Sequence, residues 1–212
     1  MTRDDLLTLF RQQIDDVAKP YLWSDEEGDE YLDDAQNMFV RLTGGISDAT
    51  SALCSFDVAI GDEFAPFDKR ILKIRYAKRG DGTELKVTNF EDHSEPGNGE
   101  RLTSTPGALV GLVVGMDDNN FRLRSIPAVA DTVSLIIKRL PLVLDLSEIA
   151  VHHHPHLVAW MKYRAYSKHD AETLDKNKAE EFLQQFTSYC VKCSGESDTR
   201  KHKQRSVAYG GI

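Results

Sequence analysis

The residues best suited to chemistry are four histidines around Pro155. They are His152, His153, His154 and His156. Imidazoles bind zinc, and a zinc-bound water can drive hydrolysis. Ligands must converge on one ion from separated backbone positions, however, whereas consecutive residues point in different directions. No His-Glu-x-x-His pattern follows, and the nearest acids are Asp145 and Glu148. A small metal-dependent hydrolase using His152–His156 is therefore the alternative to a surface loop or a pH-sensitive contact, and we predict no metal.

The three cysteines form no recognisable zinc motif. Cys190 and Cys193 make a lone Cys-x-x-Cys without the second pair of a structural zinc site, and Cys54 is far away in sequence. We interpret Cys54 and Cys190 as small core residues. The sequence also lacks a Gly-x-Ser-x-Gly elbow, a phosphate loop and a dinucleotide fingerprint. We therefore expect no catalytic residues, no cofactor and no enzyme activity.

The composition is that of an acidic globular protein. The 212 residues are 41% hydrophobic and 28% charged, with a formal net charge of -8, and this charge argues against broad nucleic-acid binding. An odd number of cysteines favours a reducing compartment. No signal peptide is visible, and the longest apolar run, Ala108–Val114, is too short to cross a bilayer. We expect a soluble protein without membrane contact.

Two helices are predicted before residue 45. Thr2–Asp5 and Ser24–Glu27 have the spacing of capping boxes. The first helix should bury Leu6, Phe10, Ile14 and Val17 before Pro20, and the second should bury a stripe up to Gly44-Gly45. The residues of that second stripe are Tyr31, Ala35, Met38, Phe39 and Leu42.

From Ile46 to Leu146 the hydrophobic period changes to two, which indicates a sheet. Leu72–Tyr76 and Leu85–Val87, joined through Gly80-Asp81-Gly82, predict one hairpin. Val110–Met116 and Phe121–Ile126 predict a second hairpin. A strand over Thr132–Lys138 follows, with Val133, Leu135 and Ile137 facing inward. The polar segment Glu91–Pro106 should be an exposed loop.

Helical periodicity returns after Pro155 in two stripes, which predict an antiparallel pair packed on the first two helices. The fold class is therefore α+β: a bundle of about four helices, two N-terminal and two C-terminal, with an inserted antiparallel β-domain and an extended C-terminal tail. The predicted divisions are 1–45, 46–149 (sandwich or barrel-like), 150–193 and 194–212. The predicted bundle core is Phe10, Ile14, Trp23, Tyr31, Phe39, Trp160, Met161, Ala165, Phe182, Leu183 and Phe186.

Four segments together resemble a known family. They are Leu22-Trp23-Ser24-Asp25-Glu26-Glu27, Tyr31-Leu32-Asp33-Asp34-Ala35-Gln36, Phe64-Ala65-Pro66 and Tyr163-Arg164-Ala165-Tyr166-Ser167-Lys168. In this order they are similar to the head-to-tail adaptor (connector) proteins of short-tailed double-stranded DNA phages, the tail tubular protein A-like adaptors. The resemblance covers roughly Leu6–Tyr189, and the histidine cluster, Cys190/Cys193 and Glu95–Gly99 depart from it.

The resemblance implies a structural virion protein at the head-tail junction, made in the host cytoplasm. It implies a homo-oligomeric ring of twelve copies that joins the portal protein to the tail nozzle or tail tube protein. DNA would pass through the channel without sequence-specific binding. Another oligomeric virion protein or assembly factor would share the composition without contacting a portal.

The C-terminal tail and one acidic run could serve such an assembly. We expect the tail to order on the portal with Tyr209 as an aromatic anchor; a solvated basic tail is the alternative. The predicted portal-binding residues are Arg200, Lys201, Lys203, Arg205, Val207 and Tyr209. Asp25–Asp34 holds seven acids and no base, which would suit a surface facing DNA or a solvated helix face.

Overall fold

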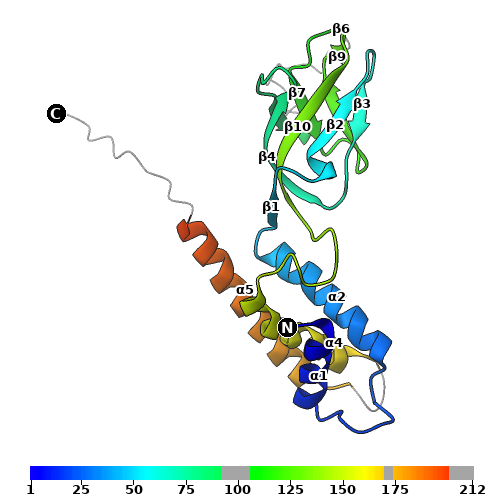
Figure 1. Ribbon diagram of the computed structural model, residues 1–212, viewed down its shortest axis with the longest axis vertical. Coiled ribbons are helices and arrows are strands. Elements are labelled where there is room, and N and C mark those ends of the chain that lie inside the picture. The colour runs from blue at the N-terminus through cyan, green and yellow to red at the C-terminus, as the bar shows by residue number, and fades with distance from the viewer. Residues whose placement is uncertain (92–105, 170–173, 201–212) are drawn as a thin grey trace, which may run out of the picture. The chain divides into compact units, whose positions relative to one another are not determined.

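The computed structural model describes residues 1–91, 106–169 and 174–200, and it has an α+β fold with two compact units (Figure 1). One unit, here called the helical unit, combines Met1–Gly44 with the chain from Val143 onward, whereas the β unit is Gly45–Leu142. Residues 143–149 therefore group with the helices. Leu146 and Ile149 are buried there, and the Leu146 N–H donates to Gln36 Oε1 at 3.0 Å.

The two N-terminal helices of the helical unit are α1 (Arg3–Gln13) and α2 (Asp25–Leu42). Both predicted capping boxes are confirmed. The Thr2 hydroxyl accepts from the Asp5 amide, and the Ser24 hydroxyl accepts from the Glu27 amide, which satisfies amides that lack helical partners.

The burial predicted near the ends of these two helices was partly wrong. α1 ends at Gln13, and Asp15 adopts a positive φ of 58°, so that Val17 lies beyond the helix and is 65% exposed. Leu42, in the last turn of α2, is 40% exposed, and Met38 is half-buried. Pro20 does not end the first helix, because α1 already ends at Gln13.

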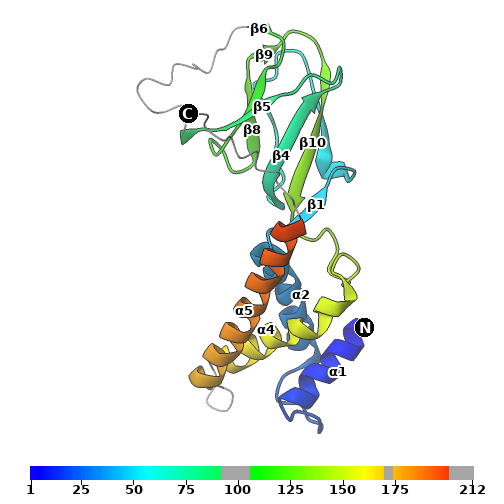
Figure 2. The ribbon, with the colours of Figure 1, turned by 90° about the vertical axis from the view of Figure 1, so that its left-hand side faces the viewer.

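The C-terminal helices are α4 (His154–Ser167) and α5 (Lys176–Arg200), which lie side by side in both views (Figures 1 and 2). A 3-10 turn, η2 (Val151–His153), precedes α4. The predicted tail from residue 194 was wrong in its first part, because α5 continues to Arg200. Its polar residues can extend the helix because backbone hydrogen bonding propagates from a formed helix without renewed nucleation. None of the described helices has both the length and the apolar character needed to span a membrane.

The β unit is built around β10 (Asp131–Arg139), which pairs antiparallel with three strands (Figure 1). These are β1 (Ile46–Asp48), β2 (Ser55–Val58) and β4 (Ile71–Arg79). The predicted inward face of β10 is confirmed, because Val133, Leu135 and Ile137 are at most 2% exposed. A short 3-10 helix, η1 (Ala52–Cys54), precedes β2.

A second sheet has the order β3, β8, β7, β5. Its strands are β3 (Phe64–Pro66), β8 (Asn120–Arg124), β7 (Gly111–Val114) and β5 (Lys86–Asn89). The antiparallel β7–β8 pair confirms the second predicted hairpin. A two-stranded parallel pair joins β6 (Pro106–Gly107) to β9 (Ile126–Pro127).

The expectation of a purely antiparallel β-domain was wrong, and the predicted first hairpin forms only near its turn, up to the hydrogen bond from Leu85 N–H to the Ala77 carbonyl at 2.9 Å. The turn forms as predicted: Gly82 has a φ of 86° and the Arg79 N–H donates to the Thr83 carbonyl at 2.9 Å. β5 then leaves β4 and pairs in parallel with β7. Gly111 permits this pairing, because a Cβ there would lie 2.4 Å from the carbonyl oxygen of Lys86. Alternation of side chains alone does not identify a strand's partner.

Candidate functional site

The histidine cluster lies at the start of a helix and not in a loop. Pro155 occupies the first turn of α4, where its missing N–H costs no helical hydrogen bond and its fixed φ suits the helix. The helix therefore begins within the cluster, and the four imidazoles acquire different surroundings.

Three of these imidazoles pack against neighbouring groups of the helical unit. His154 is 3% exposed and its Nε2 lies 2.8 Å from the Ile149 carbonyl, while its Nδ1 is buried without a partner in the described residues. His153 Nδ1 lies 2.9 Å from the Tyr189 hydroxyl, and its ring contacts Phe39 at a centroid distance of 4.9 Å. His156 stacks on Tyr189 at 3.6 Å. Burial, and then the charge of His152, lower the pKa of His153 and of His156, so both favour the neutral form.

No group of three or more histidine, cysteine or acidic side chains in the described ranges is arranged to hold a metal ion. All three cysteines are free. Cys54 belongs to the core of the β unit, whereas Cys190 is buried on α5, where burial raises its thiol pKa to about 12. The Cys193 sulfur is 3.8 Å from His153 Nδ1. The geometry gives the hydrolase alternative no support.

The acidic run of α2 pairs largely with bases of its own unit. Arg3 contacts Asp29 and Asp33, Arg11 contacts Asp25, Lys168 contacts Glu27, and Arg164 contacts Asp34. The hydrogen bond from Lys168 lowers the pKa of Glu27. These contacts give five of the seven acids a role inside the fold, which favours the helix-face interpretation over a surface facing DNA.

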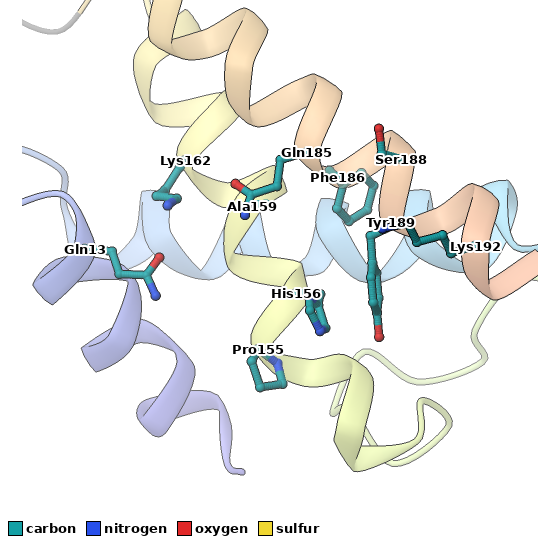
Figure 3. Close-up of a pocket in the computed structure, with 10 residues that line it drawn as sticks. All are labelled: Gln13, Pro155, His156, Ala159, Lys162, Gln185, Phe186, Ser188, Tyr189 and Lys192. Atoms are coloured by element: carbon teal, nitrogen blue, oxygen red, sulfur yellow. The ribbon is translucent and has the colours of Figure 1, made fainter.

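A groove between α1, α4 and α5 forms a concave surface on the helical unit (Figure 3). Its volume is about 340 Å³. It is lined by Gln13 from α1, by Pro155, His156, Ala159 and Lys162 from α4, and by Gln185, Phe186, Ser188, Tyr189 and Lys192 from α5. The groove therefore presents amide, hydroxyl, imidazole and ammonium groups above the buried Phe186 ring, a largely polar surface suited to a polar or charged protein segment.

Lys162 is a largely buried lysine in this groove. It is only 8% exposed, and its ammonium nitrogen lies 4.0 Å from the centroid of the Phe182 ring. Burial lowers its pKa, and the charge of Glu181 opposes this shift. None of the ion pairs or hydrogen bonds within residues 1–91, 106–169 and 174–200 involves its ammonium group.

Sequence reasoning missed the groove, although a signal was present. Lys162 follows Val158 by four residues and precedes Ala165 by three, which places a charge on the apolar stripe of its helix. A lysine on a buried stripe indicates a special environment. Gln13 belongs to a helix distant in sequence, and no local pattern links it to this position.

The predicted core residues occupy the helical unit as follows. Buried side chains belong to Phe10, Ile14, Trp23, Tyr31, Phe39, Trp160, Met161, Ala165 and Phe186. Phe182 and Leu183 are half-buried, because they lie on the flank of α5. Trp23 Nε1 donates to the Ala165 carbonyl at 3.3 Å, and Trp160 Nε1 donates to Asp34 at 2.9 Å.

The predicted portal-binding residues fall almost entirely beyond the described chain. Arg200 is the last residue of α5, and its side chain is outside the description. Lys201, Lys203, Arg205, Val207 and Tyr209 lie outside the described residues. Their role stays a prediction.

A family model described as SU10 adaptor protein matches residues 1–203. No curated protein matches the chain.

Proposed function

Because the chain belongs to the SU10 adaptor protein family, we propose that it forms a ring joining the portal protein of a phage head to the tail nozzle or tail tube protein. Membership confirms the resemblance to phage head-to-tail adaptors, and a structural adaptor of the virion turns over no substrate. The match over residues 1–203 carries the proposal, because it includes both the helical unit and the β unit.

The ring would contain twelve copies, and DNA would pass through its channel without sequence-specific binding. The net charge of -8 supports passage of DNA without tight binding, because an acidic chain repels the phosphate backbone. The solvent-facing groove of the helical unit also supports assembly, since a ring needs two different surface patches on each copy. The protein would be made in the host cytoplasm and remain soluble there until it meets the portal.

Contact with the portal would involve the C-terminal residues Arg200 to Tyr209. Their bases would meet acidic groups, and Tyr209 would fill an apolar pocket. Truncating the protein after Arg200 would remove most of these residues and keep the four helices.

The test is to mix the purified chain with its portal and image the particles by negative-stain electron microscopy. We expect twelve-fold rings stacked on portal from the full chain and their loss from the chain ending at Arg200. Full-length protein that stays apart from portal at micromolar concentration contradicts the proposed function. Rings formed equally by the truncated chain contradict only the role of the C-terminal residues.

A further inference from the structure

The groove contains a largely buried lysine that forms no ion pair within the described residues. The Phe182 ring lies against the ammonium group of Lys162, burial lowers the pKa of this group, and the charge of Glu181 only partly opposes that shift. Burial of a charge without a counterion is costly, and a carboxylate brought into the groove would offset that cost. Lys192 lines the same groove and adds a second positive charge. The chemistry of the groove therefore suits a segment bearing carboxylates.

The outer face of α2 presents such carboxylates. Glu26 and Glu30 are exposed and lie one turn apart, on the side of α2 opposite the residues it buries. Neither side chain takes part in an ion pair within the described part of the chain, whereas the five other acids of this run are paired. Glu26 and Glu30 thus form an acidic patch on an otherwise neutralised helix, here called the α2 patch.

The groove and the α2 patch belong to different sides of the helical unit. Figure 3 shows α2 behind α4 and α5, while the groove residues lie on the near side of these helices. The buried face of α2 packs toward α4, so Glu26 and Glu30 point away from it. A contact between two different patches on successive copies is heterologous and can close into a ring, whereas self-contact of one patch stops at a dimer.

We propose that the groove of one copy receives the α2 patch of the next copy, with Glu26 or Glu30 against the ammonium group of Lys162. This inference rests on the proposed function, because it names the contact between neighbouring subunits of the ring. Charge complementarity selects the occupant: an acidic helix face is matched to a basic groove on the same chain.

The experiment is a double-mutant cycle on ring formation with portal. Lys162→Met removes the charge and retains an apolar side chain of similar length, so the helical unit should keep its fold. Glu26→Gln combined with Glu30→Gln removes the charges of the exposed patch. We expect each change to raise the protein concentration needed for half-maximal ring formation by about tenfold or more, and the combined variant to be little worse than either.

Two controls match these variants. Lys176→Met removes an exposed lysine of α5 outside the groove, and Glu84→Gln removes an exposed acid of the β unit; both should assemble like wild type. Circular dichroism establishes that each variant is folded. A carbodiimide cross-link between Lys162 and Glu26 or Glu30, formed between isotopically distinct copies, would identify the contact directly.

The outcomes separate this inference from the proposed function. Wild-type protein that forms no ring on portal contradicts the proposed function. Wild-type rings that tolerate folded Lys162→Met contradict only the groove contact. Losses that simply add in the combined variant show that Lys162 and the α2 patch contact different partners, which also overturns the inference.

Discussion

Each of the two units of the chain is stabilised internally by a different kind of contact. In the β unit, the central strand β10 pairs through its backbone with three other strands. In the helical unit, side chains join segments from the two ends of the chain: Trp23 donates to Ala165 and Trp160 donates to Asp34. Backbone pairing tolerates many side chains, whereas side-chain links are lost by a single substitution. The helical unit should therefore be the more sensitive to mutation at polar positions.

Both units nevertheless use one buried aspartate to organise a loop. Asp16 pairs with Arg11 and accepts from the backbone amides of Leu22 and Trp23. Asp48 pairs with Arg139 and accepts from the amides of Thr50 and Ser51. In each unit a buried carboxylate accepts hydrogen bonds from the backbone amides of the adjoining loop, so the two units differ in what joins their elements and not in how these loops are held.

The largest effects on the free energy of unfolding should come from substitutions that create a cavity in each core. Phe186 in the helical unit and Phe121 in the β unit are both at most 1% exposed. Either substitution by alanine should lower the free energy of unfolding by about 3–5 kcal/mol, because a large cavity replaces a packed ring.

Hydrogen exchange with mass spectrometry should show where each loss occurs. We expect Phe186→Ala to reduce protection only in α1, α2, α4 and α5, and Phe121→Ala only in the strands. If either substitution reduces protection equally throughout the chain, the two units unfold as one.

The same contrast explains what could be predicted from the sequence. Capping boxes, the inward face of β10 and the β7–β8 hairpin follow from local patterns, and all three are confirmed. The parallel partner of β5 and the contribution of Gln13 to the groove depend on residues distant in sequence, which no local period encodes. The surface-loop interpretation of the histidines was wrong, because proline suits a first helical turn and Pro155 lies in the first turn of α4.

Mild acidification should have a smaller effect on the free energy of unfolding, and it should destabilise the helical unit first. Burial, together with nearby histidines, lowers the pKa of His153 and His156, so the unfolded state binds more protons just below the ordinary histidine pKa of about 6.5. Stability of the helical unit should thus fall as pH decreases from about 6.5 toward the lower folded values.

Asp48 of the β unit should respond only in stronger acid. Burial alone would raise the pKa of Asp48, but hydrogen bonds from Thr50, Arg139 and Ser51 lower it well below its usual range. The stability contributed by Asp48 is therefore present above the unfolded value of about 3.9 and is lost below it.

Denaturant titrations between pH 7 and 5 for the helical unit, extended below about pH 3.9 for the β unit and followed by hydrogen exchange in each unit, would measure this difference. His156→Phe keeps a ring on Tyr189 but cannot be protonated, so it should weaken the pH dependence of the helical unit. Asp48→Asn is the matched variant and should change the acid response of the β unit alone. Equal loss of stability in both units between pH 7 and 5 would contradict the assignment.

The smallest effects should come from single hydroxyl groups at the start of a helix or a strand. Ser24 caps α2, and the capping partner Glu27 also accepts from Lys168 at 2.6 Å, so this cap supports a link between α2 and the end of α4. Ser24→Ala should cost about 1 kcal/mol. Ser55, exposed at the start of β2, makes no side-chain hydrogen bond within the described residues, and Ser55→Ala should change stability by less than about 0.5 kcal/mol. Equilibrium denaturation of both variants measures the difference, and equal costs would show that side-chain links matter no more in the helical unit than in the β unit.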